Sequence, residues 1–190
     1  GKTIQICGLL NKIPAELRTV LVVVPASLKI NWYKEATRWL VIPRRIDILN
    51  GSGKIEGIDP ANIIQSVPAD PDILVVNYDV LAKHSEKLTS RIWDCVVFDE
   101  SHYLKNPKAA RTIHALKIRA RRRYALTGTP VPNRPIELQP ILGYLDPDNF
   151  GHFFSFAKRY ADAQRGRWGW DFTGSSNLAE LRKRLRSSLM

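Results

Sequence analysis

The chain has 190 residues, of which 44% are hydrophobic and 25% charged, as is typical of one globular domain with a single core. No apolar run approaches the roughly 20 residues that span a bilayer, and no Cys/His cluster has the spacing of a structural zinc site. The two cysteines, Cys7 and Cys95, are expected to be buried free thiols. The formal net charge of +11 favours a polyanion partner such as nucleic acid, although a solvated basic surface without a partner has the same composition.

Five short apolar runs read as strands, and apolar residues with helical spacing lie between and around them. The strand runs lack polar alternation, as in strands that are covered on both faces. They are residues 20–24, 45–49, 73–76, 95–98 and 124–126. The expected helices cover residues 4–10, a segment after residue 27, a segment from residue 106, residues 135–145, residues 152–161 and the last segment from residue 177. This alternation predicts an α/β fold with a three-layer, doubly wound parallel sheet.

Local signals predict where several of these helices begin. Ser27 is expected to cap the second helix, and Asn106-Pro107 to open the third with a cap and a first-position proline. Pro140 is expected to kink the helix of residues 135–145. Residues 165–176 read as a turn-rich stretch, and the segment from Asn177 to Glu180 as a capping box for the final helix.

Ligands of doubly wound parallel sheets bind at the carboxyl ends of the strands. Pro25, Asn77, the pair Asp99-Glu100 and the turn Thr127-Gly128-Thr129 each follow or end a predicted strand. We therefore expect these residues to lie along one edge of the sheet.

The tripeptide Gly1-Lys2-Thr3 leads directly into an apolar helical segment. Backbone N–H groups at a helix start favour a phosphate, Lys2 has the reach for β- and γ-phosphates, and the Thr3 hydroxyl suits Mg²⁺. Alone, the tripeptide is short enough to occur by chance.

Asp99-Glu100 is a stronger signal, because two carboxylates end a strand that is otherwise apolar. Buried adjacent acids are costly unless a cation or a functional role compensates them. In phosphate-loop NTPases the first acid holds Mg²⁺, usually through its bound waters, and the second can orient and deprotonate the attacking water. Two exposed loop acids are an equally weighted reading of these residues alone.

Thr127-Gly128-Thr129, before Pro130, places small hydroxyl residues after the last strand. Such residues suit a sensor of the γ-phosphate, and by themselves they also make an ordinary turn. Their order in the chain, after the lysine–threonine pair and the two acids, is what gives them weight.

Together these residues resemble the superfamily-two helicases, and within them the SWI/SNF-type DNA-translocating ATPases. The resemblance covers nearly the whole chain. The matching segments are Gly1 to Gln5 (motif I), Val22 to Leu28 with Asn31-Trp32 and Glu35 (motif Ia), Asn77-Tyr78-Asp79 (motif Ib), Asp99 to Asn106 (motif II), Leu126 to Pro130 (motif III), and Asn133 with Glu137-Leu138. Motif II departs from the usual Asp-Glu-Ala-His or Asp-Glu-Gly-His, since Ser101 stands at the third position.

The resemblance implies ATP and Mg²⁺ as cofactors and assigns roles by position. The implied phosphate and nucleotide contacts are Gly1, Lys2, Thr3, His102, Thr127, Gly128 and Thr129. Thr3 and Asp99 would hold the metal, with Asp99, Glu100 and Lys2 as the catalytic set. The implied DNA contacts are Ser27, Asn77, Tyr78 and Lys105; the first three serve equally well as caps or packing residues, and His102 as a plain loop residue.

The tail resembles the annealing-helicase branch, related to HepA-related protein, in Arg159 to Asp162 and Trp168 to Leu178. Bacterial and phage members share these features, so such a source is expected, with a cytoplasmic, nucleoid-associated location; a eukaryotic source would imply the nucleus. Trp168 and Trp170 suit stacking on bases, although a small apolar cluster is the favoured reading. On this resemblance, residues 1–150 form the ATP-binding RecA-like lobe and residues 151–190 a helical extension toward a second lobe.

The implied function is the ATP-binding lobe of a DNA-dependent ATPase that moves on duplex DNA and remodels or anneals strands. Its partners would be sequence-independent DNA and a second RecA-like lobe. Since the strand before motif I and the second lobe with its arginine finger lie outside this sequence, we expect weak or no ATPase activity from the chain alone. Alternatives are a non-catalytic basic DNA-binding module, the motor lobe of a restriction system, and an RNA helicase lobe.

Overall fold

The structure, a computed structural model, describes residues 1–50, 58–128, 134–167 and 169–188. The chain folds into two compact units. The first unit comprises Gly1–Glu100 and Ile113–Leu126, and the second comprises Ser101–Thr112 and Thr127–Met190. The expected boundary at residue 150, between the ATP-binding RecA-like lobe and the helical extension, stays a prediction.

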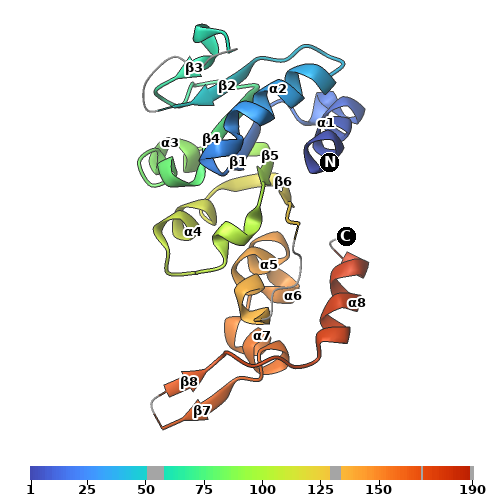
Figure 1. Ribbon diagram of the computed structural model, residues 1–190, viewed down its shortest axis with the longest axis vertical. Helices are drawn as coiled ribbons and strands as arrows, with labels where there is room; N and C mark the ends of the chain where they lie inside the picture. Colours follow the sequence, from blue (N-terminus) through green and yellow to red (C-terminus); the bar gives the residue numbers. More distant parts are fainter. Residues whose placement is uncertain (51–57, 129–133, 168, 189–190) are drawn as a thin grey trace. The chain divides into compact units, whose positions relative to one another are not determined.

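A six-stranded, fully parallel sheet forms the first unit, with the strand order β3-β2-β4-β1-β5-β6 (Figure 1). The strands are β1 Val20–Val24, β2 Ile46–Leu49, β3 Ile63–Ile64, β4 Ile73–Asn77, β5 Ile92–Phe98 and β6 Arg119–Ala125. Its helices are α1 Lys2–Lys12, α2 Lys29–Trp39 and α3 Ser85–Thr89, and α4 Ala110–Ala115 spans the boundary between the units. The predicted α/β fold with a parallel sheet is confirmed.

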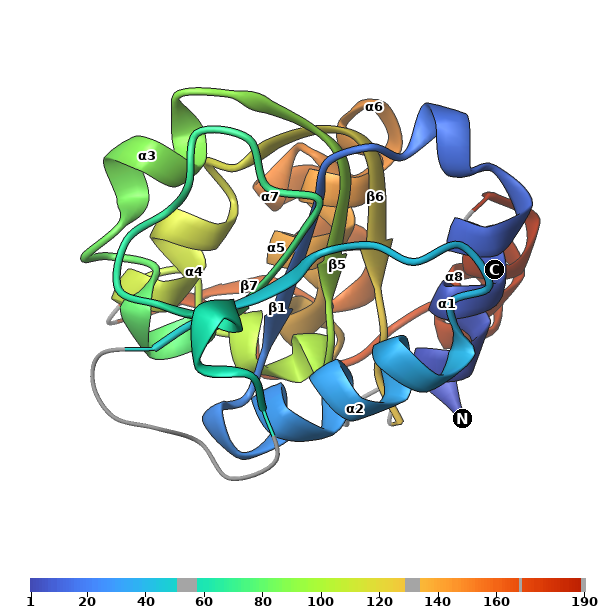
Figure 2. The ribbon, with the colours of Figure 1, turned by 90° about the horizontal axis from the view of Figure 1, so that it is seen from above.

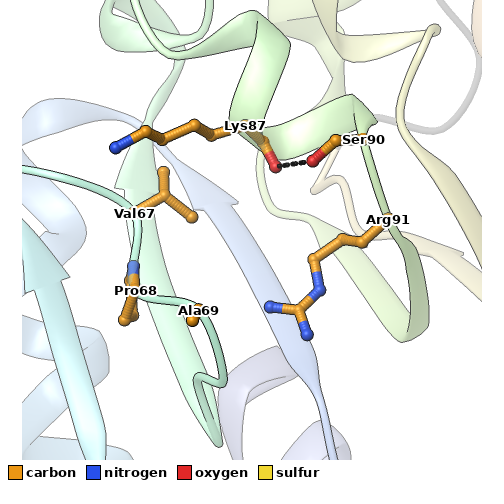
Figure 3. A pocket seen from close by; sticks show the side chains of 6 residues that line it. All are labelled: Val67, Pro68, Ala69, Lys87, Ser90 and Arg91. Carbon is orange, nitrogen blue, oxygen red and sulfur yellow. Dashed lines mark hydrogen bonds between the residues drawn. The ribbon is translucent and has the colours of Figure 1, made fainter.

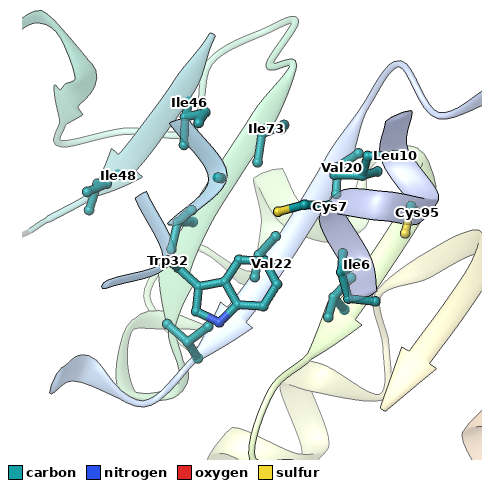
Figure 4. Close-up of a cluster of buried hydrophobic side chains, with 14 of the residues drawn as sticks. Ile6, Cys7, Leu10, Val20, Val22, Trp32, Ile46, Ile48, Ile73 and Cys95 are labelled. Atoms are coloured by element: carbon teal, nitrogen blue, oxygen red, sulfur yellow. The ribbon is translucent and has the colours of Figure 1, made fainter. Parts of the chain in front are cut away.

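The helices α1 and α2 cover one face of this sheet. Alternate residues of β1, Val20, Val22 and Val24, face a core that also holds Cys7 of α1 and Trp32 of α2 (Figure 4). Successive strand side chains point to opposite faces, so the fully buried Leu21 and Val23 face the other side. Strands buried on both faces explain the unbroken apolar runs in the sequence.

Both cysteines are buried free thiols, as predicted. Burial raises the pKa of Cys7 to about 11 and that of Cys95 to about 12. Neither thiol has the lowered pKa of a reactive cysteine, so both act as small core residues.

The strand β6 begins five residues before its predicted start at residue 124. Its first part is rich in arginine, which hides it from a search for apolar runs. In the described sheet β6 is the last strand, and Arg119, Arg121 and Arg122 are exposed. Two of them have acidic partners: Arg121 Nη1 lies 3.1 Å from Asp94 Oδ1, and Arg122 pairs with Glu16. Pairing with β5 therefore holds this arginine-rich segment in a strand, although its polar composition disfavours one.

Two predicted helix starts are wrong. Ser27 lies inside the 3₁₀ turn Ala26–Leu28, and α2 begins after it without a side-chain cap. The third helix begins at Ala110 rather than at Asn106-Pro107. The Asn106 carboxamide oxygen accepts a hydrogen bond from the Lys108 backbone N–H, so it closes a local turn instead of capping a helix.

The second unit contains α5 Gln139–Leu145, α6 Pro147–Phe150, α7 Phe153–Tyr160 and α8 Leu178–Ser188, with the antiparallel hairpin of β7 Gln164–Gly166 and β8 Gly169–Asp171. Leu142, Phe150, Phe156, Tyr160, Leu181 and Leu185 form its core. The hairpin lies in the stretch that was predicted to be turn-rich.

Two further local predictions for the second unit are corrected. Pro140 does not kink a helix, because the 3₁₀ turn Pro135–Leu138 comes first and Pro140 sits in the first turn of α5, where its missing N–H costs nothing. The Glu180 carboxylate does not serve a capping box. It accepts hydrogen bonds from Arg159 and Tyr160 of α7, and these bonds lower the pKa of Glu180.

No helix among the described residues is both long and apolar enough to cross a lipid bilayer.

Candidate functional site

The carboxyl ends of the central strands meet along one edge of the first unit (Figure 2). Val24 at the end of β1 pairs with Asn77 at the end of β4, and Phe98 at the end of β5 pairs with Val23 and Ala125. Pro25, Asn77 and the Asp99-Glu100 pair each follow or end one of these strands, so they lie at this edge of the sheet as expected.

The N-terminus of α1 lies at this edge, with Gly1 at the N-cap position and Lys2 as the first helical residue. The Lys2 Nζ atom donates to Glu100 Oε1 at 2.5 Å and lies 3.9 Å from Asp99 Oδ1. Lys2 and Glu100 are 98 positions apart in the sequence, so the fold alone brings them together. One ammonium group thus faces both acids of the predicted site.

Asp99 is held rigidly. It is only 4% exposed, and its Oδ2 atom accepts a 2.8 Å hydrogen bond from the indole Nε1–H of Trp32. Its Oδ1 atom accepts from the backbone N–H of Glu100 at 2.9 Å. A buried carboxylate needs such partners, because an uncompensated charge is expensive away from water. Trp32 therefore supports the site, although the sequence analysis placed it only in the segment that resembles motif Ia and gave its indole no role.

Tyr78 also supports Asp99, but through the main chain. Its hydroxyl donates to the Asp99 carbonyl oxygen at 2.7 Å, and its ring stacks against Phe98 with centroids 6.5 Å apart. The Tyr78 side chain is 1% exposed and packs inside the first unit, and its assignment as a direct DNA contact stays a prediction.

Asn77 is likewise buried, at 6% exposure, and its side-chain amide donates to Asp79. In this structure it holds the turn after β4. Ser27 is exposed on the turn between β1 and α2. Of the three residues expected along the strand path, Ser27 alone is exposed.

Glu100 has a backbone φ of 48°, in the left-handed region that non-glycine residues seldom adopt. Backbone strain of this kind costs on the order of 1–3 kcal/mol and persists only where the surroundings enforce it. Here the strain turns the chain immediately after β5, so that the Glu100 carboxylate faces Lys2 rather than continuing the strand.

The remaining predicted phosphate contacts are placed as follows. Thr3 is half-buried in the first turn of α1, and Gly1 and Gly128 are exposed. Thr129, Pro130, Asn133 and Trp168 lie outside the described residues. The expected approach of Thr127 and Gly128 to the acids stays a prediction, because these residues belong to different compact units.

Within the second unit, His102 and Thr127 line one small cavity of about 50 Å³ together with Lys105 and Glu137. The Lys105 Nζ atom lies 3.6 Å from Glu137 Oε2. His102 and Thr127 thus line the same cavity, whereas the nucleotide contact of His102 and the DNA contact of Lys105 remain predictions.

A larger open cleft of about 490 Å³ is lined by Val67, Pro68, Ala69, Lys87, Ser90 and Arg91 (Figure 3). These residues precede β4 and β5, so the cleft lies at the amino ends of the strands. Ligands of parallel α/β sheets bind at the opposite edge. The size of this cleft therefore does not make it the candidate site, and the Lys2–Asp99–Glu100 cluster keeps that place.

Comparison with known proteins yields a family match over the whole chain: the SNF2-related domain matches residues 1–190. The SWI/SNF-related matrix-associated actin-dependent regulator of chromatin subfamily A-like protein 1 of Xenopus tropicalis is 36% identical over 198 residues, which cover 100% of this chain and 19% of that protein. The human DNA annealing helicase and endonuclease ZRANB3 is 32% identical over 197 residues, covering 97% of this chain and 17% of that protein. The chain spans about a fifth of the length of these curated relatives.

Two solved structures share the fold. The Sulfolobus solfataricus SWI2/SNF2 ATPase core in complex with dsDNA superposes with a TM-score of 0.74 at 24% identity, over 97% of this chain and 36% of that chain. The core domain of the same organism, described without DNA, gives 0.62 at 26% identity, over 84% of this chain and 31% of that chain. The structural match confirms the RecA-like fold. The two curated relatives, both animal proteins, give no support to the expected bacterial or phage source.

Proposed function

Because the chain belongs to the SNF2-related domain family of helicase-like ATPases, we propose that its Lys2–Asp99–Glu100 cluster is the catalytic centre of a DNA-dependent ATP hydrolase. The proposal extends to translocation on duplex DNA with remodelling or annealing of strands. One observation carries it above all: Lys2 of the first helix contacts Glu100 at 2.5 Å and lies 3.9 Å from Asp99.

The chemistry of the cluster suits ATP bound with Mg²⁺. Lys2 stands at a helix N-terminus, where backbone N–H groups favour phosphate oxygens, and it adds a positive charge. The oxygens of Thr3 and Asp99 are the hard ligands that Mg²⁺ prefers, and the metal would neutralise charge on the phosphates. Trp32 holds the Asp99 carboxylate in one orientation.

Glu100 is proposed to orient the attacking water and to take its proton. Its carboxylate is only partly exposed, at 27%, and already faces the cationic centre, so it needs no large movement to act there. Gly1, Thr127, Gly128, Thr129 and His102 are proposed to complete the nucleotide site.

DNA is the proposed macromolecular partner, contacted through Ser27, Lys105 and the basic surface. The chain carries 29 Lys and Arg against 18 Asp and Glu, a surplus that suits sequence-independent contacts to phosphates. A second RecA-like lobe is proposed to close over the nucleotide. If the source is a eukaryote, as in the two curated relatives, the proposed location is the nucleus. The name of the human relative, a DNA annealing helicase, supports the annealing branch.

The test is ATP hydrolysis by the intact protein with and without duplex DNA. Glu100→Gln keeps the size of the side chain and removes the base, so DNA-stimulated hydrolysis is expected to fall by about 10²–10⁴-fold while DNA binding is kept. Glu86→Gln, at an exposed acid on α3, is the matched control and should leave hydrolysis unchanged.

The alternative function is a non-catalytic DNA-binding module. It predicts DNA binding without any hydrolysis that depends on Glu100. If the unsubstituted protein hydrolyses no ATP on DNA, or if Glu100→Gln and Glu86→Gln hydrolyse it equally, the catalytic proposal is wrong and the module is favoured.

A further inference from the structure

The helix α7 lies next to the β7–β8 hairpin in the second unit (Figure 1). Four aromatic rings from these segments contact one another. This aromatic cluster consists of Phe153, Phe154, Trp170 and Phe172. The Phe154 and Trp170 centroids are 5.6 Å apart, and the Trp170 and Phe172 rings stack with an interplanar angle of 8°. The packing confirms the apolar-cluster reading of Trp170, yet it leaves much of the cluster uncovered.

Phe154 is 52% exposed and Trp170 is 41% exposed, whereas Phe150 and Phe156 of the adjoining core are 1% and 3% exposed. The second unit therefore buries its core aromatics normally while presenting these two rings to the outside. Large exposed rings that lie next to each other mark an interaction surface.

Two cations flank the exposed rings. The Lys158 Nζ atom lies 5.9 Å from the centroid of the Trp170 ring. Arg165 is the direct cross-strand partner of Trp170 in the hairpin, and directly paired residues of an antiparallel pair project from the same face. Within the described part of the chain neither cation has a carboxylate partner, and both are exposed.

The nearby acids are already occupied. Asp171 accepts from both the backbone N–H and the hydroxyl of Thr173, which lowers its pKa, and Asp162 accepts from Gln164. The surface around Trp170 is thus aromatic and positively charged, because the carboxylates of Asp162 and Asp171 are engaged in hydrogen bonds with neighbouring residues.

We infer that this surface binds unpaired nucleotides of a nucleic acid strand, with bases stacking on Trp170 and Phe154 and phosphates meeting Lys158 and Arg165. Stacking is open to any base with a free face, whereas bases inside a duplex already cover each other. An uncharged apolar partner would leave both cations without a counter-charge. The inference rests on the proposed DNA-dependent function and adds to it the surface of the second unit that contacts the bases of an unpaired arm.

The experiment measures binding of the intact protein to three labelled DNAs: a blunt duplex, the same duplex with an unpaired thymine arm, and that fork with abasic sugar-phosphates in the arm. All three are compared at one salt concentration, and both forks carry the same phosphates. The thymine arm should bind about tenfold more tightly than the abasic arm, the order of effect expected for one or two stacked bases. Trp170→Leu, which keeps an apolar side chain, should remove that difference.

Two further variants separate stacking from damage to the hairpin. Trp170→Phe should keep most of the preference for the thymine arm, and Arg165→Gln should keep it while lowering the slope of log affinity against log salt by about 0.7. Trp39→Leu, at a tryptophan of the first unit that is 39% exposed, is the matched control and should leave all three affinities unchanged.

Equal binding of the thymine and abasic arms overturns the inference, as does a Trp170→Phe protein as weak as Trp170→Leu, or a Trp170→Leu protein that still prefers thymine. Each of these results would assign the surface to a protein partner or to packing alone. ATP hydrolysis by the unsubstituted protein on the blunt duplex is measured in parallel. Hydrolysis without arm discrimination refutes this inference alone, and arm discrimination without hydrolysis refutes the proposed function alone.

Discussion

The indole–carboxylate hydrogen bond between Trp32 and Asp99 gives the sharpest test of how the site is built. Trp32 is 2% exposed and Asp99 is 4% exposed, so the 2.8 Å bond is shielded from water. Trp32→Phe keeps an aromatic ring but removes the donor. Phenylalanine therefore leaves Asp99 Oδ2 without its indole partner.

The size of the effect follows from the charge on the acceptor. A hydrogen bond to a charged group contributes about 1.5–3 kcal/mol, against about 0.5–1.5 kcal/mol for a neutral one. Trp93→Phe is the matched control, because Trp93 is fully buried and its Nε1–H donates to a neutral acceptor, the Leu88 carbonyl oxygen, at 3.0 Å. Both substitutions shrink an indole to a phenyl ring, so the cavity cost largely cancels between them.

Trp32→Phe should therefore lower the free energy of unfolding by about 1–2 kcal/mol more than Trp93→Phe does, measured by urea denaturation. In the intact protein it should also raise the Mg²⁺ concentration needed for half-maximal ATP hydrolysis, since Asp99 loses its fixed orientation, whereas Trp93→Phe should not. Equal destabilisation by the two variants, with an unchanged Mg²⁺ requirement, would refute the positioning role of Trp32.

Two further predictions concern strain and burial. Glu100→Gly should be more stable to urea than Glu100→Ala by about 1 kcal/mol, because both remove the carboxylate but only glycine adopts the φ of 48° without strain; equal stability would contradict that strain. The buried thiols Cys7 and Cys95, with their pKa values raised from 9.0 to about 11 and about 12, favour the neutral form in the folded chain. Their contribution to stability should be complete below pH 9 and lost as the pH rises toward 11 and 12, and Cys95→Ala should flatten the unfolding free energy over that range; an unchanged pH profile would refute it.

Much of the first unit could be predicted because its central strands are buried on both faces. Unbroken runs such as those of β1 and β4 have few other stable placements, and parallel strands must end at a common edge. That geometry is why Lys2, Asp99 and Glu100 could be expected together although the chain separates them.

The parts that were missed depend on partners that sequence patterns do not reveal. The apolar face of α2 predicts that Trp32 is buried, but nothing in the pattern says that its N–H points at Asp99. Asn106 has the side chain of a helix cap and uses it in a turn. The hairpin around Arg165 and Trp170 has short, exposed strands, so neither periodicity nor burial marks it in advance.

Asp99 is contacted by residues from three of the segments that resemble helicase motifs. Its side chain accepts from Trp32 of motif Ia, its carbonyl accepts from Tyr78 of motif Ib, and Lys2 of motif I lies 3.9 Å from its carboxylate. Groups that share a partner do not contribute independently, so the effects of substituting them cannot be added. A change at Trp32 or Tyr78 alters the position from which Asp99 meets Lys2, and Glu100, bonded through its own N–H to Asp99 Oδ1, moves with it. We therefore expect the shared aspartate and its three supports to act as one unit, so that no single substitution isolates the contribution of one motif.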